Sequence, residues 1–331
     1  MKLIESKAEY LPQRSGLEGI YKQVELAGRT AYHSQNKITQ DSAKDFIDKM
    51  IKSKHGATLE HGTVYLYLEV NPENGFNKVE YPLANFTAGY NWSDVVGSIC
   101  ARYRNNQYSK VVSDIEKSKT NNGFDRVVRK YYITSNYRVI IENNWLDDLQ
   151  FLCSPTKSHE KRYTMRFTCS KAIANELVRH RKFSFLQEST RYVNYSKERH
   201  GSGVTFIVPY WIDRNRMPNT EVEIAWLDAM KKAESTYLDM VDGIVHKGVL
   251  VMPADERLSP QQARDVLPLA TKTELVMTGF SSDWGLLMDL RLFEKTGKVH
   301  PDMLDLMQKA QKAMQEAGVW SDVMSKPSKF E

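Results

Sequence analysis

The feature that most limits the fold is the alternation of residue types in Thr63–Val70 (TVYLYLEV). Its aliphatic residues occupy every second position and therefore share one face of an extended chain. They are Val64, Leu66, Leu68 and Val70. This period of two predicts a half-buried β-strand rather than a helix. Because a strand is stable only within a sheet, the rest of the chain has to supply partner strands and elements that cover the apolar face.

Further strands and several helices are expected around this segment. Strand character recurs in residues 131–141 and 162–168. Apolar residues at helical spacing predict helices, and Ser170 is a plausible N-cap for one of them. The predicted helices span residues 16–31, 41–54, 170–181, 220–246, 259–267, 282–293 and 301–317.

Residues 74–160 differ from the rest of the chain in composition. They are polar, rich in asparagine, lysine and tyrosine, and lie between two predicted strands. We therefore expect an insertion at about 74–160 between two strands of one sheet, within a single domain that spans residues 1–331. A chain of 331 residues is long enough for such a domain to bury a sizeable core.

The charge balance and the cysteines narrow the classes of function. The 46 basic and 41 acidic side chains leave a formal charge of +5, which fits anionic ligands such as nucleotides and folates. This excess is too small to indicate a nucleic-acid-binding protein, and no apolar run reaches the length of a membrane span. The three cysteines form no CxxC pair, so we expect reduced thiols in a cytoplasmic protein without a metal site.

One stretch of the chain carries groups suited to a phosphate. Arg179, His180 and Arg181 are expected at the end of a helix. The loop that follows contains Ser189 and Arg191. Guanidinium forks match phosphate and carboxylate oxygens, and serine hydroxyls and loop amides add donors, so the stretch predicts a cradle for a nucleotide. Positive side chains at a helix C-terminus also complement the helix dipole without any ligand, so the tripeptide alone is weak support.

The wider pattern resembles a known family. Arg-His-Arg, seven intervening residues and then Ser189 form a pattern similar to the signature of the flavin-dependent thymidylate synthases (the ThyX family), and Arg191-Tyr192 fits the same signature. Similar blocks occur in the family's order at Ile20–Ser34, His55–His61, Gln262–Pro268 and Thr278–Arg291. The resemblance covers residues 1–71 and 162–317, and the chain departs from the family pattern at Ala57, Phe280 and Leu286.

This resemblance implies a reaction and a fold. Members of the family catalyse the reductive methylation of dUMP to dTMP, with methylenetetrahydrofolate as carbon donor, FAD as hydride carrier and NADPH as reductant. The implied protein is a methyltransferase that forms homotetramers with shared active sites. Its implied fold is α/β of the α+β type, with a central, mostly antiparallel sheet flanked by helices.

The resemblance also assigns roles to residues. Arg291 is implied as the catalytic residue, whose guanidinium faces the uracil and stabilises negative charge on the ring. The residues implied to bind dUMP are Glu176, Arg179, Gln187, Glu188, Ser189, Thr190, Arg191, Arg264 and Arg291. The residues implied to bind FAD are His55, Thr58, Arg179, His180, Arg181 and Gln187.

Two other functions stay open at this point. A pyrimidine nucleotide hydroxymethylase on the same fold would share the nucleotide arginines and tolerate the altered flavin contacts. A nucleotide- or nucleic-acid-binding module would use the arginines together with interleaved aromatic residues, although Glu176 and Glu188 lie inside this patch. A cysteine-dependent thymidylate synthase is excluded, because Cys100, Cys153 and Cys169 lack the Pro-Cys-His setting of that enzyme. We expect neither a nucleic acid nor a membrane as partner.

Overall fold

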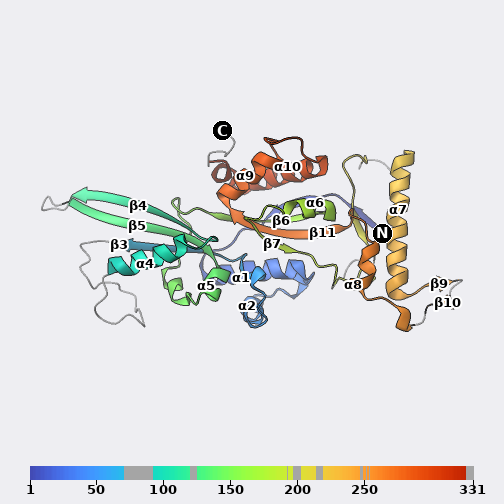
Figure 1. The fold of residues 1–331 in the computed structure, drawn as a ribbon, viewed down its shortest axis with the longest axis horizontal. Coiled ribbons are helices and arrows are strands. Elements are labelled where there is room, and N and C mark those ends of the chain that lie inside the picture. Colours follow the sequence, from blue (N-terminus) through green and yellow to red (C-terminus); the bar gives the residue numbers. More distant parts are fainter. Residues whose placement is uncertain are drawn as a thin grey trace. The chain divides into compact units, whose positions relative to one another are not determined.

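The computed structural model describes residues 1–70, 92–119, 125–191, 193–196, 203–213, 219–246, 249–250, 252 and 254–325. The chain forms two compact units (Figure 1). The first unit comprises Met1–Leu11, Leu26–Ile38 and Tyr163–Glu331. The second unit comprises Pro12–Glu25 and Thr39–Arg162. Helix α1 (Gly16–Ala31) contributes its first part to the second unit and its last part to the first.

A four-stranded sheet forms the centre of the first unit. The strands lie in the order β2, β6, β11, β7, which are Lys7–Tyr10, Arg162–Ser170, Lys272–Phe280 and Ser184–Gln187. β2 runs antiparallel to β6, with Lys7 opposite Thr168. β7 runs antiparallel to β11, with Gln187 opposite Leu275.

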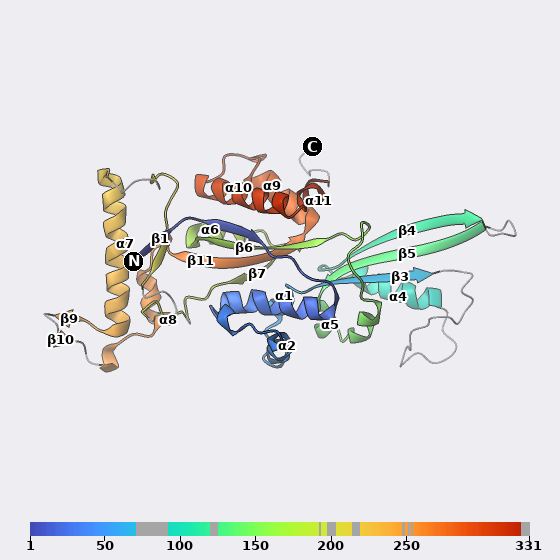
Figure 2. The ribbon, with the colours of Figure 1, turned by 180° about the vertical axis from the view of Figure 1, so that it is seen from behind.

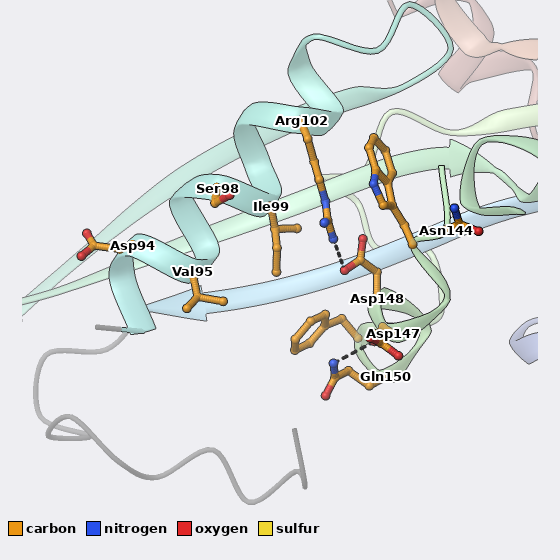
Figure 3. A pocket seen from close by; sticks show the side chains of 11 residues that line it. Asp94, Val95, Ser98, Ile99, Arg102, Asn144, Asp147, Asp148 and Gln150 are labelled. Carbon is orange, nitrogen blue, oxygen red and sulfur yellow. Dashed lines mark hydrogen bonds and ion pairs between the residues drawn. The ribbon is translucent and has the colours of Figure 1, made fainter. Parts of the chain in front are cut away.

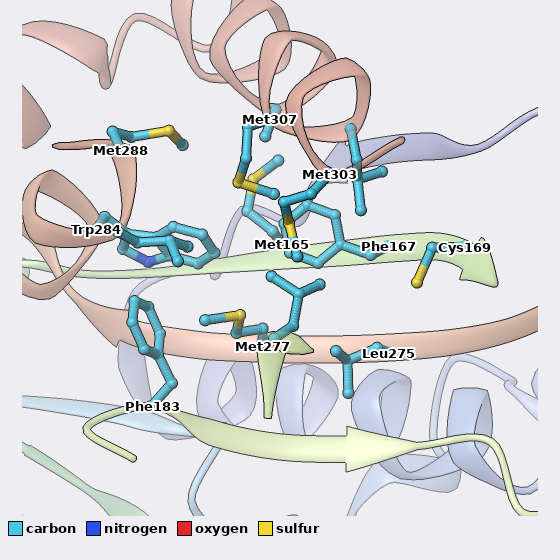
Figure 4. Close-up of a cluster of buried hydrophobic side chains, with 14 of the residues drawn as sticks. Met165, Phe167, Cys169, Phe183, Leu275, Met277, Trp284, Met288, Met303 and Met307 are labelled. Atoms are coloured by element: carbon cyan, nitrogen blue, oxygen red, sulfur yellow. The ribbon is translucent and has the colours of Figure 1, made fainter. Parts of the chain in front are cut away.

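The apolar face of this sheet packs against helices α9 (Ser281–Arg291) and α10 (Pro301–Glu316) (Figure 4). Alternate residues of β6 and β11 supply the sheet side of the core, namely Met165, Phe167, Cys169, Leu275 and Met277. Helix α10 buries residues at helical spacing, namely Met303, Leu306, Met307, Ala310 and Met314. The predicted α+β fold, with an antiparallel sheet flanked by helices, is confirmed.

The first unit also has a smaller core, which includes Phe206, Met230 and Tyr237. β1 (Lys2–Ile4) pairs in parallel with β8 (Thr205–Ile207) and lies near the long helix α7 (Glu221–Asp242) (Figure 2). The short elements are η1 (Gln35–Lys37), α6 (Lys171–Leu177), β9 (Val245–His246), β10 (Val249–Leu250), η4 (Ala254–Glu256), α8 (Pro260–Ala263), η5 (Arg264–Val266) and α11 (Trp320–Met324). None of the helices described is both long and apolar enough to cross a membrane.

The second unit contains a three-stranded antiparallel sheet. Its order is β3, β5, β4, which are Thr63–Val70, Asp125–Asn136 and Lys110–Lys119. The strand predicted from the alternating pattern is therefore confirmed as β3. Its helices are α2 (Ser42–Lys52), α3 (Gly56–Leu59), α4 (Trp92–Arg104), α5 (Tyr137–Glu142) and η2 (Leu146–Phe151).

Several predicted elements end earlier than their patterns indicate, including the helix predicted over residues 220–246, which ends at Asp242 before a short strand at Val245–His246. The strand predicted over residues 131–141 stops at Asn136, because the Asn136 side chain accepts a hydrogen bond from the backbone N–H of Val139 and caps α5. The helix predicted over residues 170–181 is capped by Ser170 as expected but ends at Leu177. The Arg-His-Arg tripeptide therefore lies beyond the helix.

The prediction that the insertion joins two strands of one sheet is wrong. β3 pairs with β5, which belongs to the insertion itself, whereas β6 pairs with β2 and β11 in the other sheet. The elements described between β3 and β6 all belong to the second unit. Residues 71–91 and 120–124 of the predicted insertion lie outside the described residues.

Candidate functional site

The loop between α6 and β7 carries the Arg-His-Arg tripeptide. The chain leaves α6 through tight turns, in which the N–H of His180 donates to Leu177 O at 3.1 Å and that of Phe183 donates to His180 O at 3.1 Å. The Phe183 ring packs edge-on against Trp284 of α9, with ring centroids 4.8 Å apart. A Cβ atom at Gly279 would lie 2.3 Å from the Phe183 ring, so this close approach requires glycine. These contacts fix the loop against α9.

Arg291, the last residue of α9, contacts this loop. Its Nε donates a hydrogen bond to Nε2 of His180 at 3.3 Å, and its Nη1 lies 3.6 Å from Oε2 of Glu176. Burial, and then the charge of Arg291, lowers the pKa of His180 to about 4. The imidazole is therefore neutral at neutral pH, with Nε2 accepting from Arg291 and the proton on Nδ1. The structure thus brings three of the predicted site residues together.

The loop also presents positive charge to solvent. The Arg291 side chain is 28% exposed, so its guanidinium remains accessible while two of its nitrogens are engaged. Arg179 and Arg181 are exposed, and neither forms an ion pair with another described residue. Guanidinium groups held in this way can bind a carbonyl, a carboxylate or a phosphate.

Glu188, which follows β7, points into the first unit. Its side chain is only 2% exposed. The carboxylate accepts from Lys272 Nζ at 3.0 Å and from the backbone N–H of Glu274 at 3.1 Å, and it lies 3.3 Å from Nε2 of His33. A buried carboxylate requires such partners, because its removal from water is costly. Glu188 therefore anchors the start of the loop that continues to Ser189.

Sequence reasoning missed the partners of Glu188. Lys272 and Glu274 lie two positions apart in β11 and so share a face of the sheet, with Lys272 Nζ 3.2 Å from Glu274 Oε1. Lys272 Nζ is also 3.2 Å from His33 Nε2. The only sign in the sequence was a pair of opposite charges, Lys272 and Glu274, at the start of a largely apolar strand. The sequence did not show that Glu188 and His33 contact Lys272.

The residues predicted to grip a phosphate gather near α8 and η5. The Ser189 N–H donates to Ala31 O at 3.3 Å, and the Ser189 hydroxyl accepts from the Arg191 N–H at 3.3 Å. Arg191 Nε donates to Gln261 Oε1 of α8 at 2.8 Å, and Arg264 begins η5 directly after α8. This hydrogen bond links the loop after β7 to the segment that carries Arg264.

Two further predicted residues of the first unit have a partner or are buried. Gln187 Nε2 donates to Thr273 Oγ1 at 3.4 Å, and Thr190 is buried. Burial lowers the pKa of Lys171 at the start of α6, while the charge of Glu188 raises this pKa and that of Arg264 lowers it. The charges of Glu188 and Arg264 therefore both affect the same side chain, Lys171. Tyr192 of the signature lies outside the described residues.

His55 and Thr58, which were predicted to contact FAD, belong to the second unit. His55 is exposed at the start of α3, and its backbone N–H donates to Met50 O at 2.9 Å. Thr58 is buried within α3. The positions of His55 and Thr58 are therefore described relative to the second unit alone.

The side chains present fit an anionic dinucleotide in part. Exposed Arg179 and Arg181 suit the charge of a diphosphate. Phe280 is buried before α9 and Leu286 is half-buried within it, so neither offers a polar contact. Among the described residues, no group of three or more histidine, cysteine, aspartate or glutamate side chains could hold a metal ion.

Comparison with known proteins finds similarity to one family over part of the chain. Residues 156–317 match the family model described as "Thymidylate synthase complementing protein". A flavin-dependent thymidylate synthase of Pyrococcus furiosus is 29% identical over 127 residues, which are 38% of this chain and 44% of that protein. One of Corynebacterium diphtheriae is 31% identical over 132 residues, which are 38% of this chain and 46% of that protein. The chain thus matches less than half of the length of these relatives.

A solved structure aligns with more of the chain than these relatives do, but at lower sequence identity. It is the UMP/dUMP methylase PolB of Streptomyces cacaoi bound with 5-Br UMP, at 13% identity and a TM-score of 0.40. The overlap covers 98% of this chain and 96% of that one. At this level the likeness carries no argument about function.

Proposed function

We propose that the chain, whose residues 156–317 match the model of the thymidylate synthase complementing protein family, is a flavin-dependent thymidylate synthase. The proposed reaction is the reductive methylation of dUMP to dTMP, with methylenetetrahydrofolate as carbon donor and NADPH as reductant. The proposal includes self-association into a homotetramer with shared active sites, which sedimentation of the purified protein tests.

One observation carries the proposal. Arg291 and His180 lie 111 positions apart in the chain, yet they share a hydrogen bond at the loop that holds the Arg-His-Arg tripeptide. The two segments that resemble the family's nucleotide site are therefore joined in this chain. This is the arrangement expected if both segments face one bound nucleotide.

In the proposed mechanism, Arg291 activates the uracil ring. Its guanidinium fork lies against N3 and the neighbouring carbonyl of dUMP and stabilises the negative charge that develops when C5 acts as a nucleophile. His180 is a positioning residue, because its neutral imidazole holds Arg291 Nε without adding a competing charge. Glu176 limits the rotation of the same guanidinium from its other side.

The nucleotide phosphate is proposed to bind at the loop after β7. The Arg191 guanidinium, the Ser189 hydroxyl and the Thr190 amide would supply donors, and Arg264 would add charge from η5. Glu188 contributes by holding the beginning of this loop on β11 through its buried ion pair with Lys272. Gln187 completes the set of residues proposed to contact the nucleotide.

FAD is proposed to contact the residues that the family resemblance implies, namely His55, Thr58, Arg179, His180, Arg181 and Gln187. When bound and reduced by NADPH, FAD supplies a hydride. The chain's own contribution is orientation and fixed charge: exposed Arg179 and Arg181 offer guanidinium groups to an anionic cofactor.

A pyrimidine nucleotide hydroxymethylase is the second candidate. The observation that favours it is the apolar character of two positions where the family has polar flavin contacts, the buried Phe280 and the half-buried Leu286. Such an enzyme would use the same dUMP-activating arginine and would transfer the carbon without the final hydride.

The test is a product assay with dUMP, methylenetetrahydrofolate, FAD and NADPH, and with each component omitted in turn. The proposed synthase forms dTMP, identified by mass spectrometry, and forms none when FAD is omitted after removal of bound flavin. Formation of 5-hydroxymethyl-dUMP regardless of FAD would establish the second candidate instead. Binding of DNA with no turnover of dUMP would overturn both.

A further inference from the structure

A cavity of about 350 Å³ lies in the second unit, outside the residues that match the family model. It is formed between α4 (Trp92–Arg104) and the segment Asn144–Phe151, which includes η2 (Figure 3). Nothing in the proposed reaction uses these residues. A volume of this size is typical of a site for a small organic ligand.

The walls of the cavity combine apolar and aromatic surfaces. Val95 and Ile99 of α4 supply aliphatic side chains, and Trp145 and Phe151 supply rings. The guanidinium carbon of Arg102 lies 4.7 Å from the Trp145 ring centroid, so the arginine stacks on this ring. Flat, apolar surfaces of this kind favour a planar ligand.

An ion pair between the buried Asp148 and the half-buried Arg102 forms part of the lining. Asp148 has a side chain that is 4% exposed, and it accepts hydrogen bonds from Arg102 and from the Tyr103 hydroxyl, the latter at 2.8 Å. Burial raises the pKa of Asp148. The Nε atom of Arg102 is buried and has no hydrogen-bond partner among the described residues. The Arg102 side chain is nevertheless 35% exposed, so the rest of its guanidinium can donate to a carbonyl or a ring nitrogen of a ligand.

The charges of the lining select against anions. Asp94, Asp147 and Asp148 line the cavity together with one arginine, so carboxylates outnumber cations. Asp94 and Asp147 are exposed and retain acceptor oxygens for N–H groups. A phosphate or a carboxylate tail placed here would meet like charge.

We propose that this cavity binds an uncharged or cationic, planar nitrogen heterocycle of nucleoside size. Its ring lies among Trp145, Phe151 and Ile99, a ring nitrogen or carbonyl accepts from the exposed part of the Arg102 guanidinium, and its N–H groups donate to Asp147. The site shares no residue with the one proposed for dUMP, and it does not depend on the proposed reaction.

The test measures binding of adenosine, guanosine, thymidine and pterin to the full-length protein by calorimetry, with saturating dUMP present to occupy the proposed catalytic site. At least one of the four is expected to bind. For a nucleoside that binds, its 5′-monophosphate is expected to bind at least tenfold more weakly, because a factor of ten corresponds to about 1.4 kcal/mol of charge repulsion. Binding of none of the four, or tighter binding of the monophosphate, would overturn the proposal.

Two variants locate the binding. Ser98→Trp places an indole in the cavity from an exposed position of α4, and it is expected to abolish binding. Gly97→Trp is the matched control, because Gly97 is the preceding residue of the same helix, does not line the cavity, and has open space around a Cβ atom. Equal binding by the two folded variants would place the ligand elsewhere and contradict the proposal.

Discussion

Arg291 donates a hydrogen bond from Nε to Nε2 of His180 at 3.3 Å, and burial together with this arginine lowers the pKa of the histidine to about 4. The pair therefore consists of one cation and one neutral ring at neutral pH. A protonated His180 could no longer accept from Arg291 and would repel it. Neutrality of the histidine is thus a condition for the orientation of the arginine.

The first prediction concerns stability against pH. Between pH 4 and the ordinary histidine pKa of 6.5, the unfolded chain binds a proton at His180 that the folded chain does not. The free energy of unfolding is therefore expected to fall as the pH is lowered through this range. His180→Gln removes the titration and should make the fall smaller. Urea unfolding at several pH values between about 4.5 and 7 measures the free energy of unfolding of both proteins. An equal dependence of this free energy on pH in the two proteins would show that His180 is not held neutral.

The second prediction concerns the buried pair of Glu188 and Lys272. Lys272→Met leaves a carboxylate that is 2% exposed without its ammonium partner, and it should lower the free energy of unfolding by about 3 kcal/mol. Lys231→Met is the control, because Lys231 and Asp228 form an exposed pair on α7 whose loss should cost less than about 1 kcal/mol. Denaturant unfolding of both variants makes the comparison.

A second substitution is expected to restore part of the stability that Lys272→Met loses. Adding Glu188→Gln to Lys272→Met removes the uncompensated charge, so the double variant should be more stable than Lys272→Met alone. A double variant that is as unstable as the sum of both single changes would show that the two side chains act independently.

The third prediction concerns the cysteines. Burial raises the pKa of the Cys100 and Cys153 thiols to about 11 and that of Cys169 to about 12. None is therefore a thiolate at neutral pH, which a nucleophile would require. Replacing all three by alanine should leave turnover of dUMP per folded molecule unchanged, although cavities at the buried positions lower stability. Loss of turnover by a folded triple variant would point to a cysteine mechanism.

The regular elements were the most predictable part of this chain. The alternation in Thr63–Val70 predicted β3 with its correct bounds, and the helical spacing in Pro301–Glu316 predicted α10. Both patterns are local, because a side chain's periodicity depends only on its own element. The family resemblance further singled out Arg291 and His180, which the structure joins.

Long-range pairing was the part that the sequence did not reveal. The sheet partners of β3 and β6 depend on which segments meet in space, and the two strands lie in different sheets. The same reason explains why Lys272 and His33 were missed as partners of Glu188, since each comes from a separate segment. Asn136 shows a local failure, because its capping hydrogen bond overrides the strand propensity of the residues that follow.

The fourth prediction separates binding from activation. Arg191 and Arg264 are proposed to hold the phosphate in the ground state and the transition state alike. Their alanine variants should therefore weaken dUMP binding and leave turnover at saturating dUMP nearly unchanged. Direct binding of dUMP, measured by calorimetry together with steady-state kinetics, distinguishes this outcome from a loss of the chemical step.

The most direct test of the account is tritium release from [5-³H]dUMP by Arg291→Ala at saturating dUMP, in the presence of methylenetetrahydrofolate, FAD and NADPH. Removing one preorganised charged donor should lower the rate about a hundredfold or more while dUMP still binds. Arg291→Lys should restore little, because an ammonium lacks the planar fork. A rate close to that of the unaltered protein for Arg291→Ala would contradict the assignment of Arg291 as the activating residue.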